Sequence, residues 1–256
     1  MMEQMPMSEH LDVLRKMLMR LAAVVITLMI ALFCLKDPVF DLLLAPKESD
    51  FWTFRMIERL LHVCGSPFCF EPYHVDLINT ELSGQFMAHL SSSFVLAILL
   101  ASPYILVEIF GFVKPALYEK ERHYASKVGV VMYLLFAVGV MMNYFVLFPI
   151  SFRFLGTYQV SDAVVNTITL DSYLSTFSTL TFMMGLVFQL PLICWFLGRI
   201  GLVTATMMRT YRRHAFVAIM IIAAVITPPD VFTLCLVTVP LYLLYEISIW
   251  VVRSEV

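Results

Sequence analysis

Six long apolar segments constrain this chain more than any other feature, and they cover residues 18–35, 85–110, 127–154, 174–196, 214–227 and 231–250. A run of about 20 apolar residues crosses a bilayer as a helix, because a helix satisfies its own backbone polar groups in hydrocarbon. The chain is 61% hydrophobic and 14% charged, whereas soluble domains carry about 25% charged residues. The sequence therefore predicts an all-α integral membrane protein with a single membrane domain over residues 1–256.

The fifth segment is short, because its fourteen residues reach only about 21 Å as a helix and a hydrocarbon core is about 30 Å thick. The charges nevertheless favour six crossings. With the N-terminus in the cytoplasm, the inner segments hold twelve of the seventeen Lys and Arg residues, as expected for cytoplasmic loops. Without the fifth crossing, Arg253 would lie outside. We therefore predict six spans with both termini inside.

Four spans contain an interior proline, which removes a backbone hydrogen bond and tends to bend a helix. Bent helices favour a curved wall over a straight bundle. The sequence thus predicts a concave wall of helices, with these prolines at Pro103, Pro149, Pro191 and Pro240.

The outer loop over residues 36–84 is long enough to be structured. Ser49 and Asp50 can cap a helix in this loop. We predict an amphipathic helix that lies on the outer membrane surface or caps the bundle, with one apolar face made by Phe51, Phe54, Ile57 and Leu61. Cys64 and Cys69 follow it, and either a disulfide or two free thiols is compatible with an outer compartment.

Polar residues inside the spans are few. Glu108 and Glu246 lie near inner span ends, where each can reach the interface or a basic partner. Gln189 is nearer mid-membrane and must find a hydrogen-bond partner, on a helix of this chain or of another subunit. Asp230 follows two prolines and can cap the sixth span, a role favoured over ligand binding.

Nothing in the sequence predicts catalysis or a cofactor. No two histidines sit at ligand spacing on one helix, and phosphate-binding or nucleophile motifs are absent from the sequence. We therefore predict no metal, no cofactor and no catalytic residue. The net charge of −2 gives no argument for nucleic-acid binding.

A dense charge cluster, FGFVKPALYEKERHY, lies over residues 110–124 between two spans. Pro115 redirects the chain, and a helix can then start at the charged run. The positive-inside rule explains its Lys and Arg but not Glu119 and Glu121. A carboxylate at a membrane interface suits a cation, and a guanidinium best of all, because its fork geometry allows two parallel hydrogen bonds.

The N-terminal segment SEHLDVLRKML offers the same elements on a predicted helix. One face is apolar, and the other carries Glu9, Asp12, Arg15 and Lys16. Both segments lie on the predicted inner side. Together they can form one polar surface at the cytoplasmic membrane face.

These two segments, together with YFVLFPISFRFL, DSYLSTFSTLTFMMGLVFQLPL and ITPPDVFT, resemble the TatC family of twin-arginine translocase subunits, from about Glu9 to Trp250. The resemblance implies a glove-like wall of six helices in a bacterial inner (plasma) membrane. It implies a receptor for signal peptides with two adjacent arginines, which helps export folded proteins using the proton-motive force and carries no cofactor. The implied partners are single-span TatA- and TatB-type subunits, membrane lipid and further copies of the chain in the complex.

The resemblance also assigns residues to signal-peptide binding. The family's acidic residue in the first inner loop falls on Glu121, next to Lys120 and Arg122, and its upstream aromatic and proline fall on Phe112 and Pro115. Its basic N-terminal position falls on Arg15.

The chain departs from the family at two positions. Where a second acidic residue often precedes the N-terminal Leu-Arg pair, this chain has Val13, and either Asp12 or Glu9 can replace the missing carboxylate. Where span four often has a carboxylate, this chain has Gln189, which cannot titrate. We expect partner helices to contact Gln189 and the short fifth and sixth spans, including Asp230 and Glu246.

Two other functions were weighed against this one. A small-solute secondary transporter or channel predicts internal repeats and facing charges at mid-membrane, where this chain offers Gln189, Asn143 and hydroxyls. A membrane enzyme would need a nucleophile with a base or a metal set, which the sequence lacks.

Overall fold

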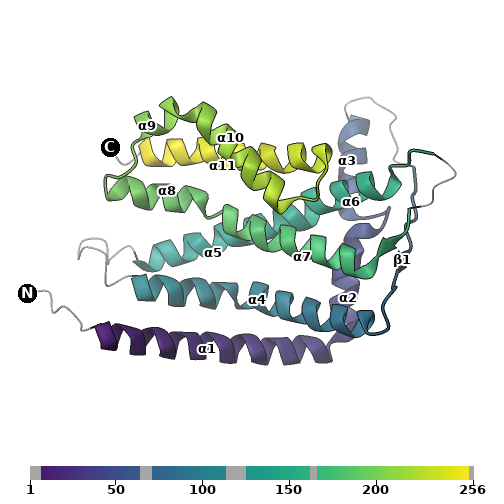
Figure 1. Cartoon of the computed structure of the whole chain (residues 1–256). Coiled ribbons are helices and arrows are strands. Elements are labelled where there is room, and N and C mark those ends of the chain that lie inside the picture. Colours follow the sequence, from purple (N-terminus) through teal and green to yellow (C-terminus); the bar gives the residue numbers. More distant parts are fainter. Residues whose placement is uncertain (1–6, 64–70, 114–124, 162–165, 254–256) are drawn as a thin grey trace, which may run out of the picture. The chain divides into compact units, whose positions relative to one another are not determined.

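The computed structural model describes residues 7–63, 71–113, 125–161 and 166–253. Helices dominate this part of the chain (Figure 1), which confirms the all-α prediction. In chain order the elements are α1 (Met7–Cys34), α2 (Lys36–Leu44), η1 (Ala45–Lys47), α3 (Trp52–Val63), β1 (Leu77–Ile78), α4 (Gly84–Val113), α5 (Ala125–Met142), the π-helical η4 (Asn143–Leu147), α6 (Phe148–Thr157), β2 (Ile168–Thr169), α7 (Leu170–Val187), α8 (Leu190–Arg199), α9 (Ala205–Thr210), α10 (Arg212–Ile226) and α11 (Val231–Arg253).

Within the described residues, five helical stretches are long and apolar enough to cross a membrane: Leu11–Cys34, Gly84–Ile109, Val128–Thr157, Leu170–Arg199 and Val231–Val252. They match five of the six predicted spans. The remaining one, the fifth in chain order, was predicted over residues 214–227 and corresponds to α10, whose 15 residues reach about 22 Å. Its crossing stays a prediction.

Contacts divide the chain into two compact units, which we describe separately. Unit 1 comprises Met1–Val39 and Phe86–Leu134, and unit 2 comprises Phe40–Gln85 and Leu135–Val256. In unit 1, α1 and α4 lie side by side and antiparallel (Figure 1). Arg20 reaches Glu108 toward one end of the pair, and the Phe33 ring stacks on His89 toward the other, with ring centroids 4.1 Å apart.

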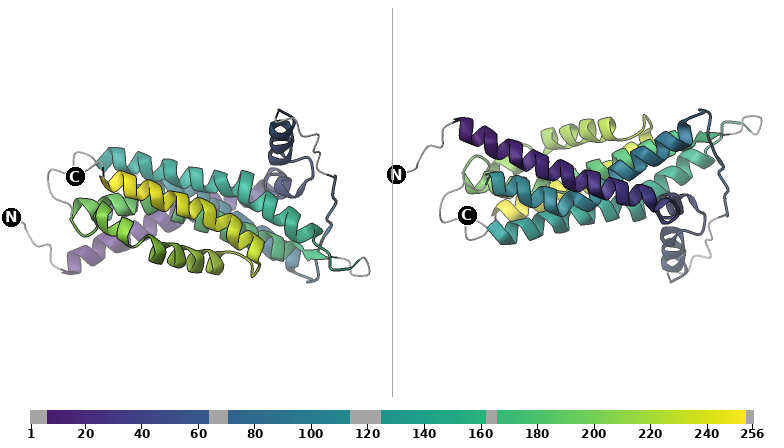
Figure 2. Two further views of the ribbon diagram at one scale, coloured as in Figure 1. Left: turned by 90° about the horizontal axis from the view of Figure 1, so that it is seen from above. Right: turned by 90° about the horizontal axis from the view of Figure 1, so that it is seen from below.

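Unit 2 has an aromatic core and close helix contacts. The Phe148 ring meets Tyr173 and Phe177 edge-on at 5.1 and 4.9 Å between centroids. Glycines let α5 and α7 approach, because a Cβ added at Gly139 would lie 2.5 Å from the Met184 carbonyl oxygen. The short helix α10 ends in a tight turn, and α11 then runs back alongside it (Figure 2).

Two of the four interior prolines coincide with interruptions of a helix. Pro149 follows η4, and its ring nitrogen cannot donate to the Phe145 carbonyl four residues earlier. The Thr53 hydroxyl donates to that carbonyl instead. Pro191 follows the break between α7 and α8, whereas Pro103 and Pro240 lie inside continuous helices.

The described part of the predicted outer loop over residues 36–84 is structured, as predicted. Its helix α3 presents Phe54 to the interior of unit 2, and Phe51 packs against the Tyr144 and Phe145 rings. Asp50 accepts two hydrogen bonds from the Arg55 guanidinium. The parallel strands β1 and β2 pair Leu77 with Ile168 and Ile78 with Thr169.

Candidate functional site

The predicted recognition residues fall in two segments that adjoin described helices. Asp12 and Arg15 are exposed on the first turns of α1. Glu9 lies on the same helix, but its side chain is outside the described residues, as is that of Phe112 in the last turn of α4. Four more of these residues lie outside the described part of the chain, in the sequence between α4 and α5: Pro115, Lys120, Glu121 and Arg122.

A three-residue clamp holds α1 against α4 close to these segments. The Arg20 guanidinium donates to one Glu108 oxygen at 2.9 Å, and the Tyr104 hydroxyl donates to the other at 2.7 Å. The Glu108 side chain is only 19% exposed, whereas that of Arg20 is 58% exposed. A partly buried carboxylate keeps its charge when both oxygens accept hydrogen bonds. The clamp therefore ties the helix that carries Asp12 and Arg15 to the helix that leads into the Glu121 loop.

The sequence left two alternatives for Glu108, the membrane interface or a basic partner, and it did not identify Arg20 or Tyr104. Tyr104 precedes Glu108 by four residues on one helix, a spacing that places both side chains on one face. The hydrogen bond between Tyr104 and Glu108 could therefore have been predicted from this spacing. Arg20 lies 88 residues away, and only the packing of α1 on α4 brings it to the carboxylate.

The other predicted polar residues lie in unit 2. The Asp230 carboxylate accepts from the Thr233 backbone amide at 2.6 Å, which confirms that it caps α11. Gln189 lies in the turn between α7 and α8, and it is 7% exposed. This burial favours a partner within the same chain.

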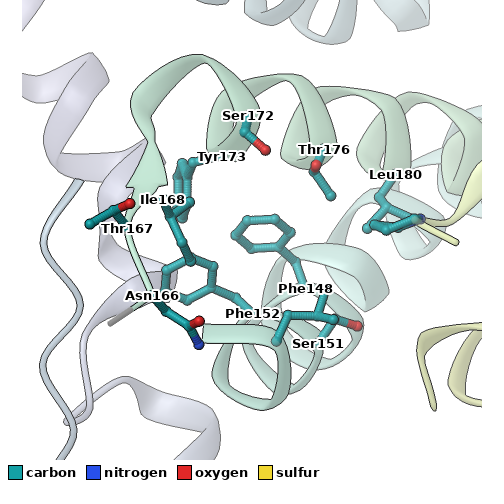
Figure 3. A pocket seen from close by; sticks show the side chains of 12 residues that line it. Phe148, Ser151, Phe152, Asn166, Thr167, Ile168, Ser172, Tyr173, Thr176 and Leu180 are labelled. Atoms are coloured by element: carbon teal, nitrogen blue, oxygen red, sulfur yellow. The ribbon is translucent and has the colours of Figure 1, made fainter. Parts of the chain in front are cut away.

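A cavity of about 290 Å³ also lies in unit 2 (Figure 3). Its walls include the rings of Phe148, Phe152 and Tyr173 and the hydroxyls of Ser172 and Thr176. None of the predicted recognition residues lines it. It is part of the aromatic core, where the Tyr173 hydroxyl donates to the Leu43 carbonyl at 2.9 Å.

The model of the family described as Sec-independent protein translocase protein (TatC) matches residues 9–240 of the chain. This chain belongs to the TatC family. A TatC protein of Blattabacterium sp. subsp. Periplaneta americana (strain BPLAN) is 33% identical over 252 residues, which cover 97% of this chain and 95% of that protein. TatCy of Bacillus subtilis (strain 168) is 33% identical over 98% of this chain and 90% of its own length.

A crystal structure of the twin-arginine translocase receptor TatC matches this fold with a TM-score of 0.74. The two chains are 26% identical, and the match covers 96% of this chain and 98% of that one. The chain is thus a multi-pass membrane protein of the Sec-independent translocase, and the solute-transporter interpretation is not retained.

This TatC-family chain repeats the clamp in unit 2. The Arg212 guanidinium donates to Glu246 at 2.7 Å, and the Tyr242 hydroxyl, four residues before Glu246, donates to the other oxygen at 3.2 Å. Of the two alternatives that the sequence left open for Glu246, the interface or a basic partner, the structure shows the basic partner. The clamp ties the start of α10 to α11.

No group of three or more His, Cys, Asp or Glu residues that could hold a metal ion occurs in the described part of the chain. Cys34, Cys194 and Cys235 are free thiols. Cys64 and Cys69 lie outside the described residues, so their pairing stays a prediction.

Proposed function

We propose that this chain is the receptor subunit of a twin-arginine translocase, which binds twin-arginine signal peptides at the cytoplasmic face and helps export folded proteins using the proton-motive force. The Arg20–Glu108 clamp is the observation that carries the proposal, because it holds the two motif-bearing helices together. The chain continues from α4 into the segment that holds Glu121, and α4 is tied to α1, which carries the exposed Asp12 and Arg15. This connection supports one shared binding neighbourhood.

In this neighbourhood, Glu121 accepts two parallel hydrogen bonds from one signal arginine, which a lysine cannot supply. Asp12 or Glu9 accepts from the second arginine in place of the acidic residue that Val13 replaces. Arg15, Lys120 and Arg122 belong to the same surface, and Phe112 and Pro115 shape the chain that leads into it.

Binding of a twin-arginine signal peptide tests this proposal, with a twin-lysine peptide as the competitor. A hydrogen bond to a charged group contributes about 1.5–3 kcal/mol, so Glu121→Ala should weaken twin-arginine binding by roughly ten- to a hundredfold. The matched control is Glu119→Ala, which removes a carboxylate two residues away and should leave the affinity unchanged. Equal affinities for both peptides with wild type and Glu121→Ala would refute the receptor role.

We further propose six crossings with both termini in the cytoplasm and single-span TatA- and TatB-type partners. Because α10 is about 22 Å long, it would cross only a locally thinned bilayer. Its exposed apolar face is the proposed partner surface, flanked by Asp230 and Glu246. The Gln189 side chain is buried in unit 2, so a partner helix would contact it only if the side chains around it move.

Labelling of single cysteines with an impermeant reagent tests the crossing by α10. In a chain whose five native cysteines are replaced by alanine, Met207→Cys and Val231→Cys place thiols on exposed residues before and after α10. We expect only Val231→Cys to react from outside intact cells. Reaction of both from one side would show that α10 does not cross.

A further inference from the structure

Helix α3 has two apolar faces, of which the sequence predicted only one. The first packs inward through Phe54. The second is exposed and follows helical spacing, so its members lie within about 80° of one another around the helix. This outer stripe consists of Trp52, Met56, Leu60 and Val63.

An apolar groove of about 600 Å³ continues this stripe onto α5. Its walls are Trp52 and one face of α5 and η4, formed by Val138, Met141, Met142 and Phe145. The Trp52 ring meets Phe145 edge-on at 5.4 Å between centroids and stands at one end of the groove. From Phe145 to Val138 the groove extends about 10 Å along the helix, inside the candidate span Val128–Thr157.

Two arginines lie beside the outer stripe on the same side of α3. Arg55 pairs with Asp50, whereas Arg59 forms no ion pair with any residue that the structure describes. Helices that lie in the headgroup layer combine such cations with Trp and aliphatic residues. An indole ring is favoured at the boundary between headgroups and hydrocarbon.

We propose that this groove binds an anionic phospholipid, with one acyl chain along Val138, Met141 and Phe145 and the headgroup phosphate at Arg59. The groove lies in a helical stretch that is long and apolar enough to cross a membrane, so its apolar walls match an acyl chain. The Arg59 guanidinium, which pairs with no residue that the structure describes, lies two turns from Trp52 on the helix that forms the mouth, and it gives the charge complementarity for a phosphate. The 12 residues of α3 are too few to cross a bilayer, which agrees with an interfacial position.

Tryptophan fluorescence in reconstituted vesicles tests this site. The chain has three tryptophans, so Trp195→Phe and Trp250→Phe leave Trp52 as the only one. The probes are phosphatidylglycerol and phosphatidylcholine, each brominated on the upper acyl chain and each present at a low mole fraction in phosphatidylcholine vesicles. A cation near an anionic headgroup contributes about 1 kcal/mol, so brominated phosphatidylglycerol should be enriched about fivefold at Trp52.

Two substitutions locate the binding. Arg59→Gln should abolish the enrichment while brominated phosphatidylcholine still quenches Trp52. Val138→Phe should fill the groove and reduce quenching by both lipids. The matched control is Val239→Phe, which changes an exposed valine of α11 and should change nothing.

If both lipids quench Trp52 in proportion to their mole fractions, Trp52 contacts only bulk lipid and the groove does not select the anionic lipid. That outcome would overturn the proposal. If neither lipid quenches Trp52, protein from a second copy or a partner subunit covers this face. That outcome would also overturn the proposal. Neither outcome would affect signal-peptide binding at Glu121, so the two proposals fail independently.

Discussion

The two clamps have the same three residue types but hold helices of different packing. In unit 1, Tyr104, Glu108 and Arg20 join α4 to α1, and in unit 2, Tyr242, Glu246 and Arg212 join α11 to α10. In the candidate membrane span of α1, Leu11–Cys34, only 6% of the most apolar part is buried. In that of α11, Val231–Val252, the buried share is 50%. The same clamp should therefore provide a larger share of the contacts that hold α1 than of those that hold α11.

Other contacts hold α11 independently of its clamp. The Tyr245 hydroxyl donates to the Met208 carbonyl at 2.7 Å, and Val252 packs against the Gly198 position of α8. In unit 1, the Phe33 ring stacks on His89 and meets Phe86 edge-on, and these aromatic contacts accompany the clamp. Weaker attachment makes α1 easier to move than α11, because mobile elements come from the less stable parts of a fold.

The largest expected effect on stability comes from adding a side-chain atom at the close contact between α5 and α7 in unit 2. In Gly139→Ala the new Cβ would lie 2.5 Å from the Met184 carbonyl oxygen, which is backbone and cannot rotate away. We expect a loss of about 1–3 kcal/mol in the free energy of unfolding, measured from the unfolding midpoint in detergent.

The matched control for this change lies on the same helix in unit 1. In Gly129→Ala the nearest atom to the new Cβ is Val107 Cγ2 at 3.8 Å, an ordinary contact. The higher helix propensity of alanine should leave stability unchanged or raise it by up to about 1 kcal/mol. Equal losses for the two variants would contradict the difference in packing.

A smaller effect is expected at the end of α11 that Asp230 caps. Asp230→Ala removes the acceptor for the Thr233 amide and should cost about 1 kcal/mol of unfolding free energy. Asp230→Asn keeps an acceptor oxygen and should cost only a few tenths of that amount. If the two substitutions are equally destabilising in the same unfolding measurement, the carboxylate acts through something other than capping.

The clamps themselves should show local rather than global effects. Glu108→Gln should raise amide hydrogen exchange in the first turns of α1 by up to about fivefold, because a partly exposed ion pair contributes up to about 1 kcal/mol. Glu246→Gln should leave exchange in α11 unchanged, since its buried contacts remain. An equal response in both helices would remove the distinction between the clamps.

The smallest effect is expected from pH at α3. The Arg55 guanidinium beside Asp50 lowers the pKa of that carboxyl. A lowered pKa in the folded state stabilises the fold above the usual carboxyl pKa of about 3.9, and this contribution is lost as the pH falls through the folded pKa. Trp52 fluorescence in the single-tryptophan chain should therefore change slightly on strong acidification. The change should be absent in Asp50→Asn.

Local patterns in the sequence were enough to predict much of this protein. Apolar run lengths predicted five spans that the structure reproduces, apolar spacing predicted α3, and the residues before α11 predicted the Asp230 cap. The motifs that carry the resemblance to TatC also lie in continuous stretches. These features depend on neighbours within a few turns, so they can be read without the fold.

Only the tertiary structure decided how distant segments meet. Arg20 finds Glu108 across 88 residues, and Thr53 takes the Phe145 carbonyl that Pro149 leaves without a donor across 92 residues. The second apolar face of α3 became visible only when the first was buried. Such pairings depend on helix packing and on which polar groups lack a nearby partner, and neither is contained in the local spacing of residues.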